Sequence, residues 1–489
     1  MTGSRATVSR RAGVAVALAV LIVSGCSGPI ATPSSVRATA PRFTFGLPSP
    51  LPSPSDGPTL EPSPSPTAQP PSADVPSWLQ GDFEVAMGNL TGLTPTDDLG
   101  SAAGLQIDDF GMDLLRKLES SGHNLCISPT SIALSLAMVR AGAKGQTAAE
   151  MDKVLHGFGS PADEAAVLSL VNQLQSRTML ADADGVPIDP DTSPGTGSPV
   201  VELNLANEAF LQQGSTFERS YLDTIYSEFN AGAGLLDFAS APEHSRMAIN
   251  AWASKLTHGR IPEVLHSGDV TDATRIALAN AIYFKAAWHS RFDPKNTAKR
   301  AFTTSSGQVK YVPTMSGTVS SAYAAGKDYK AVALSYSGSF DMVVIVPSNL
   351  SAFVKSADAA RLGEVISALQ PYDVQLTMPR FSLDTRAELS PVLSAMGMPT
   401  VFTPAADLTG ISSTLGLDLS HVIHQANIDV VEDGTTAAAV TVALGATTGG
   451  GMDTPPTVKF HIDRPFLYFI RDLSGAVLFE GVVNDPTSK

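Results

Sequence analysis

Residues 432–454 read EDGTTAAAVTVALGATTGGGMDT and contain no charge between Asp433 and Asp453. Because the side chains of a strand alternate between two faces, one face of this run holds only small residues: Thr435, Ala437, Ala439, Thr441, Ala443 and Gly445. A segment that slides into the middle of an existing sheet needs such a face, since overpacking costs about 1–3 kcal/mol. A charge there would be buried unpaired, and a proline would remove a ladder hydrogen bond. The run therefore has the properties that insertion into a sheet requires, although the pattern alone favours a flexible surface loop.

The segments outside this run predict a mixed fold. Asp341–Pro347, Val374–Pro379 and Phe466–Ile470 have the composition of strands. Much earlier, Ser128-Pro129 is typical of a helix start, because a capping side chain precedes a proline at the first helical position. Apolar residues follow at helical spacing, and Gly142 closes that helix. Helices in the front part and strands in the back part indicate an α+β fold.

Composition limits the possible partners. The chain has 489 residues, 43% hydrophobic and 16% charged, so it can bury a sizeable core. Its net charge is −15 and its pI is about 5.0. Phosphate binding needs clustered Lys and Arg, and the sequence shows no basic stripe. We therefore expect no nucleic-acid partner.

The residues that could carry catalysis or bind a metal are sparse. The sequence contains neither a Gly-x-Ser-x-Gly elbow nor a His-Glu-x-x-His motif, so an enzyme is not expected. His421 and His424 are three residues apart without a nearby third ligand, which predicts no metal site. Cys126 lies between Leu125 and Ile127 and is interpreted as a small buried hydrophobic residue. No cofactor is expected.

The first part of the chain has the features of a targeting signal followed by an extended stalk. Residues 1–25 combine a basic start with an apolar run too short to span a membrane, which predicts an export signal. The run ends in Val23-Ser24-Gly25-Cys26, which resembles the lipobox of bacterial lipoproteins, so Cys26 is predicted to be lipidated. An ordinary secretory signal is the alternative. Residues 26–77 are rich in Pro and Ser and predict an extended stalk, followed by a linker over 78–107 and a folded domain over 108–489. The domain is thus expected on the extracellular side of the cell membrane, held by the lipid.

Several motifs together resemble one protein family. Asn124-Leu-Cys-Ile-Ser-Pro129, Asn280-Ala-Ile-Tyr-Phe-Lys285 and Arg464-Pro465-Phe466 occur in the order found in serpins, and so does Phe479-Glu-Gly481. The resemblance runs from about Phe110 to Pro486. It implies the serpin fold, with helices packed around a large mixed main β-sheet, two further sheets and an exposed reactive-centre loop at about 432–454.

The resemblance also implies roles for individual residues. The hinge of the loop comprises Glu432, Gly434, Thr435, Ala437, Ala439 and Thr441. Counting as the family does, the reactive bond falls at Thr448–Gly449, with Leu444, Ala446 and Met452 as alternatives. Arg380 and Glu432 correspond to an ion pair at the top of the main sheet beside Trp288. A polar cluster that bridges the strands which must part comprises Ser128, Ser131, Asn280 and His424. The simpler interpretations are a helix cap for Ser128, a core histidine for His424 and surface charges for the ion pair.

The implied function is suicide inhibition of a serine or cysteine protease. The loop would be cleaved, insert as a new strand and trap the acyl-enzyme. A loop without Arg or Lys suggests an elastase-like or subtilisin-like target. We expect a monomer without catalytic groups of its own. The alternatives are a non-inhibitory serpin-fold binding or adhesion module and, more remotely, a surface hydrolase. Residues 180–200 are interpreted as an inserted polar loop of unassigned role.

Overall fold

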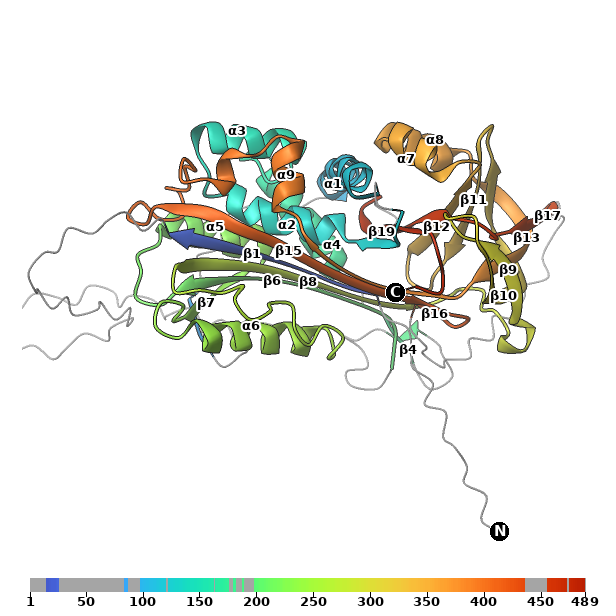
Figure 1. The fold of residues 1–489 in the computed structure, drawn as a ribbon, viewed down its shortest axis with the longest axis horizontal. Helices are drawn as coiled ribbons and strands as arrows, with labels where there is room; N and C mark the ends of the chain where they lie inside the picture. Colours follow the sequence, from blue (N-terminus) through green and yellow to red (C-terminus); the bar gives the residue numbers. More distant parts are fainter. Residues whose placement is uncertain are drawn as a thin grey trace, which may run out of the picture.

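The computed structural model describes residues 15–25, 83–86, 97–119, 122–161, 163–175, 179–181, 187–188, 198–435, 455–472 and 475–488. A larger main sheet and a second sheet contain the strands (Figure 1). None of the helices in the described ranges is long and apolar enough to cross a membrane.

The main sheet has ten strands. Its central order is β14 (Phe381–Glu388), β15 (Leu417–Val430), β1 (Ala15–Gly25), β8 (Thr274–Ala287), β6 (Ser198–Gln212), β4 (Met179–Ala181) and β5 (Pro187–Ile188). Three short strands lie off this path: β16 (Gly434–Thr435) pairs with β8, β7 (Gly232–Leu236) with β6, and β2 (Glu84–Ala86) with β7. The pair β6–β7 is parallel and the pair β6–β8 is antiparallel, so the sheet is mixed.

Strand β1 lies in the middle of this sheet. It is antiparallel to β15 on one side and to β8 on the other, and it separates these two strands (Figure 1). This segment lies inside the range for which the sequence predicts an export signal. The structure places it as an inner strand of the sheet, and the export signal stays a prediction.

The second sheet has nine strands in two parts that share β10 (Val309–Ala325). One part contains β9 (Ala298–Thr303), β13 (Gln370–Pro379) and β17 (Thr457–His461). The other contains β11 (Tyr329–Ser335), β12 (Phe340–Pro347), β18 (Phe466–Asp472), β19 (Val477–Val483) and β3 (Leu125–Ile127). The three strands predicted from sequence are confirmed as β12, β13 and β18.

Helices cover both faces of the main sheet, and α7 (Leu350–Ser356) and α8 (Ala359–Ser367) lie beside the second sheet (Figure 1). The other helices are α1 (Asp97–Leu118), α2 (Pro129–Arg140), α3 (Gly145–Val154), α4 (Glu164–Gln175), α5 (Arg219–Phe229), α6 (Pro242–Leu256) and α9 (Ser390–Met396). Two 3-10 turns lie at Pro294–Asn296 and Thr400–Phe402. Figure 1 shows α6 on one face of the main sheet and α2, α4 and α5 on the other. The predicted α+β class is confirmed, although β2 and the first part of α1 lie in residues 78–107, which the sequence assigns to a linker.

Strand β8 shows why the sheet is buried on both faces. Its alternate residues Ile276, Leu278, Ile282 and Phe284 belong to the large core under α2. The intervening residues Ala277, Ala279, Ala281 and Tyr283 belong to a smaller core with α6. Period-two alternation thus supplies two apolar faces.

Helix α2 begins as predicted: Ser128 is its N-cap, and the Ser128 side chain accepts a hydrogen bond from the backbone N–H of Ser131.

Two buried carboxyl groups lie where α1 meets β19. Oδ1 of Asp108 accepts a hydrogen bond from the backbone N–H of Val477 at 3.2 Å, and Asp108 is 8% exposed. Burial raises the pKa of Asp108 to about 8. Burial, and then the neighbouring Asp108, raise the pKa of Glu480 well above its ordinary value. Both groups therefore favour the protonated form in the folded protein.

This arrangement predicts a pH-dependent stability. The folded chain holds a proton on Asp108 up to about pH 8, whereas the unfolded chain releases it near the ordinary pKa of 3.8. Stability from this group is therefore full below the unfolded pKa and falls as pH rises to the folded pKa, by on the order of 1 kcal/mol per pH unit. Asp108→Asn keeps the acceptor oxygen but cannot ionise. Its urea midpoint relative to wild type should rise steadily between about pH 5 and about pH 8.

Asp272→Asn is the control, because Asp272 is exposed. It should leave the pH slope unchanged. An Asp108→Asn variant with the wild-type slope would show that this carboxyl is ionised in the fold.

Candidate functional site

A tight turn connects β15 to β16 at one end of the main sheet. The backbone N–H groups of Val431 and Gly434 each donate to the other residue's carbonyl oxygen at 3.1 Å. Gly434 has φ of 134°, and a Cβ atom built there would lie 2.3 Å from the carbonyl oxygen of Ala286. Only glycine fits this position. The chain then pairs with β8 through Gly434–Ala287 and Thr435–Ala286.

Glu432 anchors this turn. Its side chain is 5% exposed, and Oε1 accepts a hydrogen bond from Nε of Arg380 at 2.7 Å. The hydroxyl of Thr297 donates to the same oxygen. The backbone N–H of Phe292 donates to the Glu432 carbonyl oxygen at 3.1 Å. The structure thus brings Arg380 and Glu432 together, and it buries the carboxylate while the arginine side chain stays 40% exposed.

Trp288 holds the other side of the turn. Its Nε1 donates to the Val431 carbonyl oxygen at 2.9 Å, and its backbone N–H donates to the Asp433 carbonyl oxygen at 3.0 Å. Its ring stacks on Tyr336 with centroids 4.2 Å apart. The Tyr336 hydroxyl lies 2.6 Å from Oγ1 of Thr435. Sequence reasoning missed Tyr336 and Thr297, because the sequence carries no signal for contacts with partners so far away along the chain.

The predicted polar cluster is fully buried between the start of α2, which contributes Ser128 and Ser131, and the main sheet, which contributes Asn280 and His424. The backbone N–H of Ser128 donates to Nε2 of His424 at 3.1 Å. The hydroxyl of Ser131 donates to the Asn280 carbonyl oxygen at 3.3 Å, and Nδ2 of Asn280 donates to Oδ1 of Asn207. Burial lowers the pKa of His424 to about 3, so its ring is neutral and Nε2 can accept. Asn207 is a member of the cluster that sequence reasoning missed.

The two strand members of this cluster do not touch each other. His424 on β15 and Asn280 on β8 are both register partners of Ala19 on β1. Nδ1 of His424 and Oδ1 of Asn280 have no hydrogen-bond partner among the described residues. A buried polar atom left without a partner costs about 1–3 kcal/mol. Strand β1 therefore separates β15 from β8. Nδ1 of His424 on one side of it and Oδ1 of Asn280 on the other lack hydrogen-bond partners among the described residues.

Strands β16 and β1 pair with successive residues along the same edge of β8, and this edge is named the track. Thr435 pairs with Ala286, and Ala15 pairs with Phe284. If the register of β16 is continued, Ala437, Ala439 and Thr441 fall opposite Phe284, Ile282 and Asn280. In the structure these positions are held by Ala15, Ala17 and Ala19. The hinge residues Ala437, Ala439 and Thr441, the reactive bond Thr448–Gly449 and its alternatives Leu444, Ala446 and Met452 lie outside the described residues, as does Cys26.

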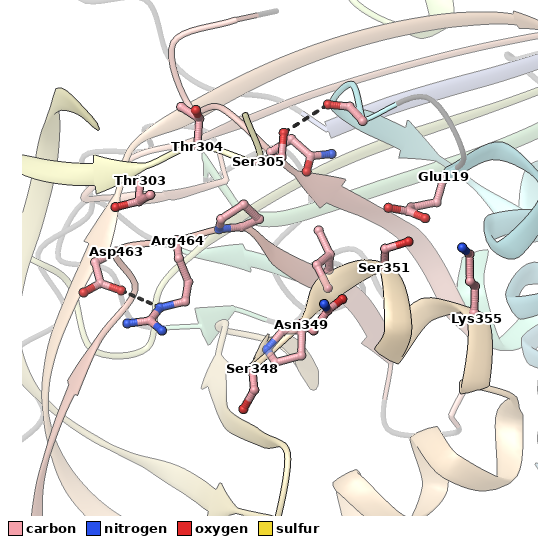
Figure 2. Close-up of a pocket in the computed structure, with 15 residues that line it drawn as sticks. Glu119, Thr303, Thr304, Ser305, Ser348, Asn349, Ser351, Lys355, Asp463 and Arg464 are labelled. Carbon is pink, nitrogen blue, oxygen red and sulfur yellow. Dashed lines mark hydrogen bonds and ion pairs between the residues drawn. The ribbon is translucent and has the colours of Figure 1, made fainter. Parts of the chain in front are cut away.

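A surface pocket of about 740 Å³ lies elsewhere (Figure 2). It is bounded by the end of α1, the start of α7, the turn after β9 and the residues before β18. Asp463 and Arg464 form an ion pair at 2.9 Å (Figure 2), and the hydroxyl of Ser305 donates to the carbonyl oxygen of Gly122 at 3.3 Å. No residue of the predicted site lines it.

The groups considered for metal binding and nucleophilic chemistry have structural roles. No three His, Cys, Asp or Glu side chains form a metal-binding group in the described part of the chain. His421 contacts Glu388 through Nδ1 and Oε2 at 2.9 Å, and this bond raises the pKa of His421. Cys126 is buried with a free thiol, and burial raises its pKa to about 12. Such a thiol is a poor nucleophile.

Comparison with known proteins gives a consistent match. A family model described as serpin (serine protease inhibitor) matches residues 105–486. Iripin-8 of Ixodes ricinus is 33% identical over 388 residues, which cover 77% of this chain and 91% of that protein. The leukocyte elastase inhibitor of Xenopus laevis is 32% identical over 391 residues, covering 77% and 97%. The native structure of tengpin, a thermophilic serpin, has a TM-score of 0.65 at 23% identity and covers 82% of this chain and 97% of that one.

The anchoring of the turn predicts unequal effects of two carboxylate substitutions. Glu432→Gln removes the charge from a buried group that accepts hydrogen bonds from Arg380 and Thr297, and it should cost about 1–2 kcal/mol. Glu364→Gln is the matched control, because Glu364 pairs with Arg361 at 2.9 Å but its side chain is 66% exposed. It should cost less than about 0.5 kcal/mol. Urea unfolding of both variants measures the difference, and equal costs would show that the Glu432 pair behaves as an ordinary surface contact.

Proposed function

Because the chain belongs to the serpin family, we propose that it is a suicide inhibitor whose loop inserts between β8 and β15 after cleavage. At the level of the family it is a protease inhibitor and not an enzyme. The mechanism, the cell-surface location and the identity of the target form the proposal.

The observation that carries the proposal is the track along β8. Strand β16 already forms the first two pairs of a strand on this track, and Thr435 is fully buried. Directly opposite residues of an antiparallel pair lie on the same face of the sheet. The loop positions that would face the core under α2 are therefore Ala437, Ala439, Thr441 and Ala443, which are all small. A loop with this face can continue β16 without overpacking that core.

The polar cluster gives the sheet a way to open and close. In a sheet without an inserted strand, β8 and β15 would be neighbours, and Nδ1 of His424 and Oδ1 of Asn280 would be free to pair. With a strand between them, the parted atoms need other partners. We infer that the protein stays kinetically trapped with its sheet closed and its loop exposed until a protease cleaves the loop. The acyl-enzyme formed at that moment is carried along as the loop inserts, before hydrolysis finishes.

The proposed reactive bond is Thr448–Gly449. Because the loop has no Arg or Lys, a trypsin-like pocket has nothing to bind, whereas small and apolar residues suit elastase-like and subtilisin-like proteases. A relative named leukocyte elastase inhibitor supports this class of target.

The proposed location is the outer face of the cell membrane, where lipid on Cys26 would hold the domain through the Pro-rich stalk over 26–77.

Trapping is expected to be visible on denaturing gels. The processed chain, which lacks residues 1–25, is mixed with pancreatic elastase, subtilisin and trypsin, and it should give a denaturant-stable complex with elastase or subtilisin and none with trypsin. Mass spectrometry of the released tail should find a fragment that starts at Gly449, and another start moves the reactive bond. Cleavage without a complex across the panel, and without a rise in Tm of the cleaved protein, would favour a non-inhibitory serpin.

The face of the loop should decide between trapping and simple cleavage. Ala439→Glu places a charge where the register puts a residue under the core, opposite Ile282, so insertion should fail and the complex should be lost while cleavage continues. Thr454→Glu is the matched control. It adds the same charge to the loop beyond the reactive bond, on the part that does not insert, and should still trap. Loss of the complex in both variants would mean that the charge acts on protease recognition instead.

A further inference from the structure

The strand between β8 and β15 is β1, Ala15–Gly25, which lies within the predicted export signal and is named the leader. Strand β1 pairs with β15 from Val16 to Gly25 and with β8 from Ala15 to Ser24. Leu21 is fully buried, belongs to the large core and lies opposite Leu278 and Val422. The backbone of an inner strand needs hydrogen bonds on both edges, and β1 provides them to β8 and β15 at once.

The leader also matches the sequence pattern of the loop. Along β8, the register positions opposite Phe284, Ile282 and Asn280 are alanine in the leader, and the continued register of β16 gives alanine, alanine and threonine. The positions between them hold larger aliphatic residues, namely Val16, Leu18 and Val20 in the leader. The corresponding loop residues are Ala438, Val440 and Val442. One track thus suits two segments of the same chain.

We propose that the slot between β8 and β15 binds the leader strand Ala15–Gly25, and that the bound leader keeps the unprocessed chain from trapping proteases. Both segments need the same edge of β8, so the loop can insert only when the leader has left. This inference rests on the proposed function, because blocking has a consequence only if the loop inserts. Since the leader is tethered to the domain, its effective concentration at the slot is high.

The end of β1 connects this site to export. The strand ends at Gly25, directly before Cys26, the residue proposed to carry lipid. Cleavage between Gly25 and Cys26 would remove the whole of β1 and leave the slot to the loop. The inhibitor would then remain inactive toward proteases inside the cell and become a trap only after processing.

The test uses the full chain carrying Cys26→Ala, made by cell-free synthesis without membranes so that the leader stays attached. Ala19→Pro removes a backbone N–H in the middle of β1 and should release the strand. Ala12→Pro, which precedes β1, is the matched control. Leu21→Lys serves as a second releasing variant if Ala19→Pro does not fold. Hydrogen exchange of residues 15–25 reports the occupied slot, and denaturing gels with elastase and subtilisin report trapping.

The starting chain and Ala12→Pro should show slow exchange over 15–25 and cleavage without a complex. Ala19→Pro or Leu21→Lys should show fast exchange and a denaturant-stable complex. Fast exchange over 15–25 in the starting chain, with trapping equal to that of the releasing variants, overturns the inference and leaves the proposed function intact. Slow exchange in the starting chain with no complex from any variant supports the leader site and overturns both trapping and its blocking.

Discussion

An inner strand of a sheet has to be hydrogen-bonded along both edges, because buried backbone groups without partners are costly. Helices pack on both faces of the sheet, and strand β8 pairs with β6 on one edge and with β1 and β16 on the other. Whatever occupies that edge determines the state of the molecule. Strand β15 could pair with it directly, the loop could continue β16 along it, or a third segment such as β1 could fill it. The function proposed for this protein depends on exchange among these occupants.

The packing of the two faces limits which segments qualify. The face under α2 is filled by residues such as Leu278, Ile282 and Phe284, so an arriving strand has little room there. Both the loop and the leader meet this limit with small residues at the positions opposite Ile282 and Phe284. A bulky or charged residue at these positions would be excluded by overpacking or by burial of an unpaired charge. At these two positions the packing therefore favours an occupant with small side chains, whereas opposite Leu278 the leader has the buried Leu21 and the continued register of β16 gives Ala443.

Sequence reasoning predicted the mixed fold, the start of α2 and three strands from local patterns, since capping and strand composition are set by neighbouring residues. Ser128, Asn280 and His424 were recognised through a family resemblance. Asn207, Tyr336 and Thr297 were missed, because each contacts a residue far away along the chain, and local patterns do not encode such contacts. The leader was harder still. The run that includes Ala15–Gly25 is apolar and follows a basic start, which favours an export signal, yet its alternation of alanine with larger residues also suits an inner strand. One segment can have both the pattern of an export signal and the pattern of an inner strand, and only the arrangement of the sheet reveals that it forms a strand.

The two occupants differ at one position that matters. The leader places Ala19 opposite Asn280 and His424, and neither Oδ1 of Asn280 nor Nδ1 of His424 has a partner among the described residues. The continued register of β16 places Thr441 there, and its hydroxyl is both a donor and an acceptor. A loop strand could therefore satisfy an atom that the leader leaves unpaired, at about 1–3 kcal/mol for each buried polar atom. The turn anchored by Glu432 and Trp288 also fixes the first residue of the loop at the edge of β8. On the proposed mechanism, the slot is better matched to the loop than to the leader, so the leader would be the removable occupant and the inserted loop the final one.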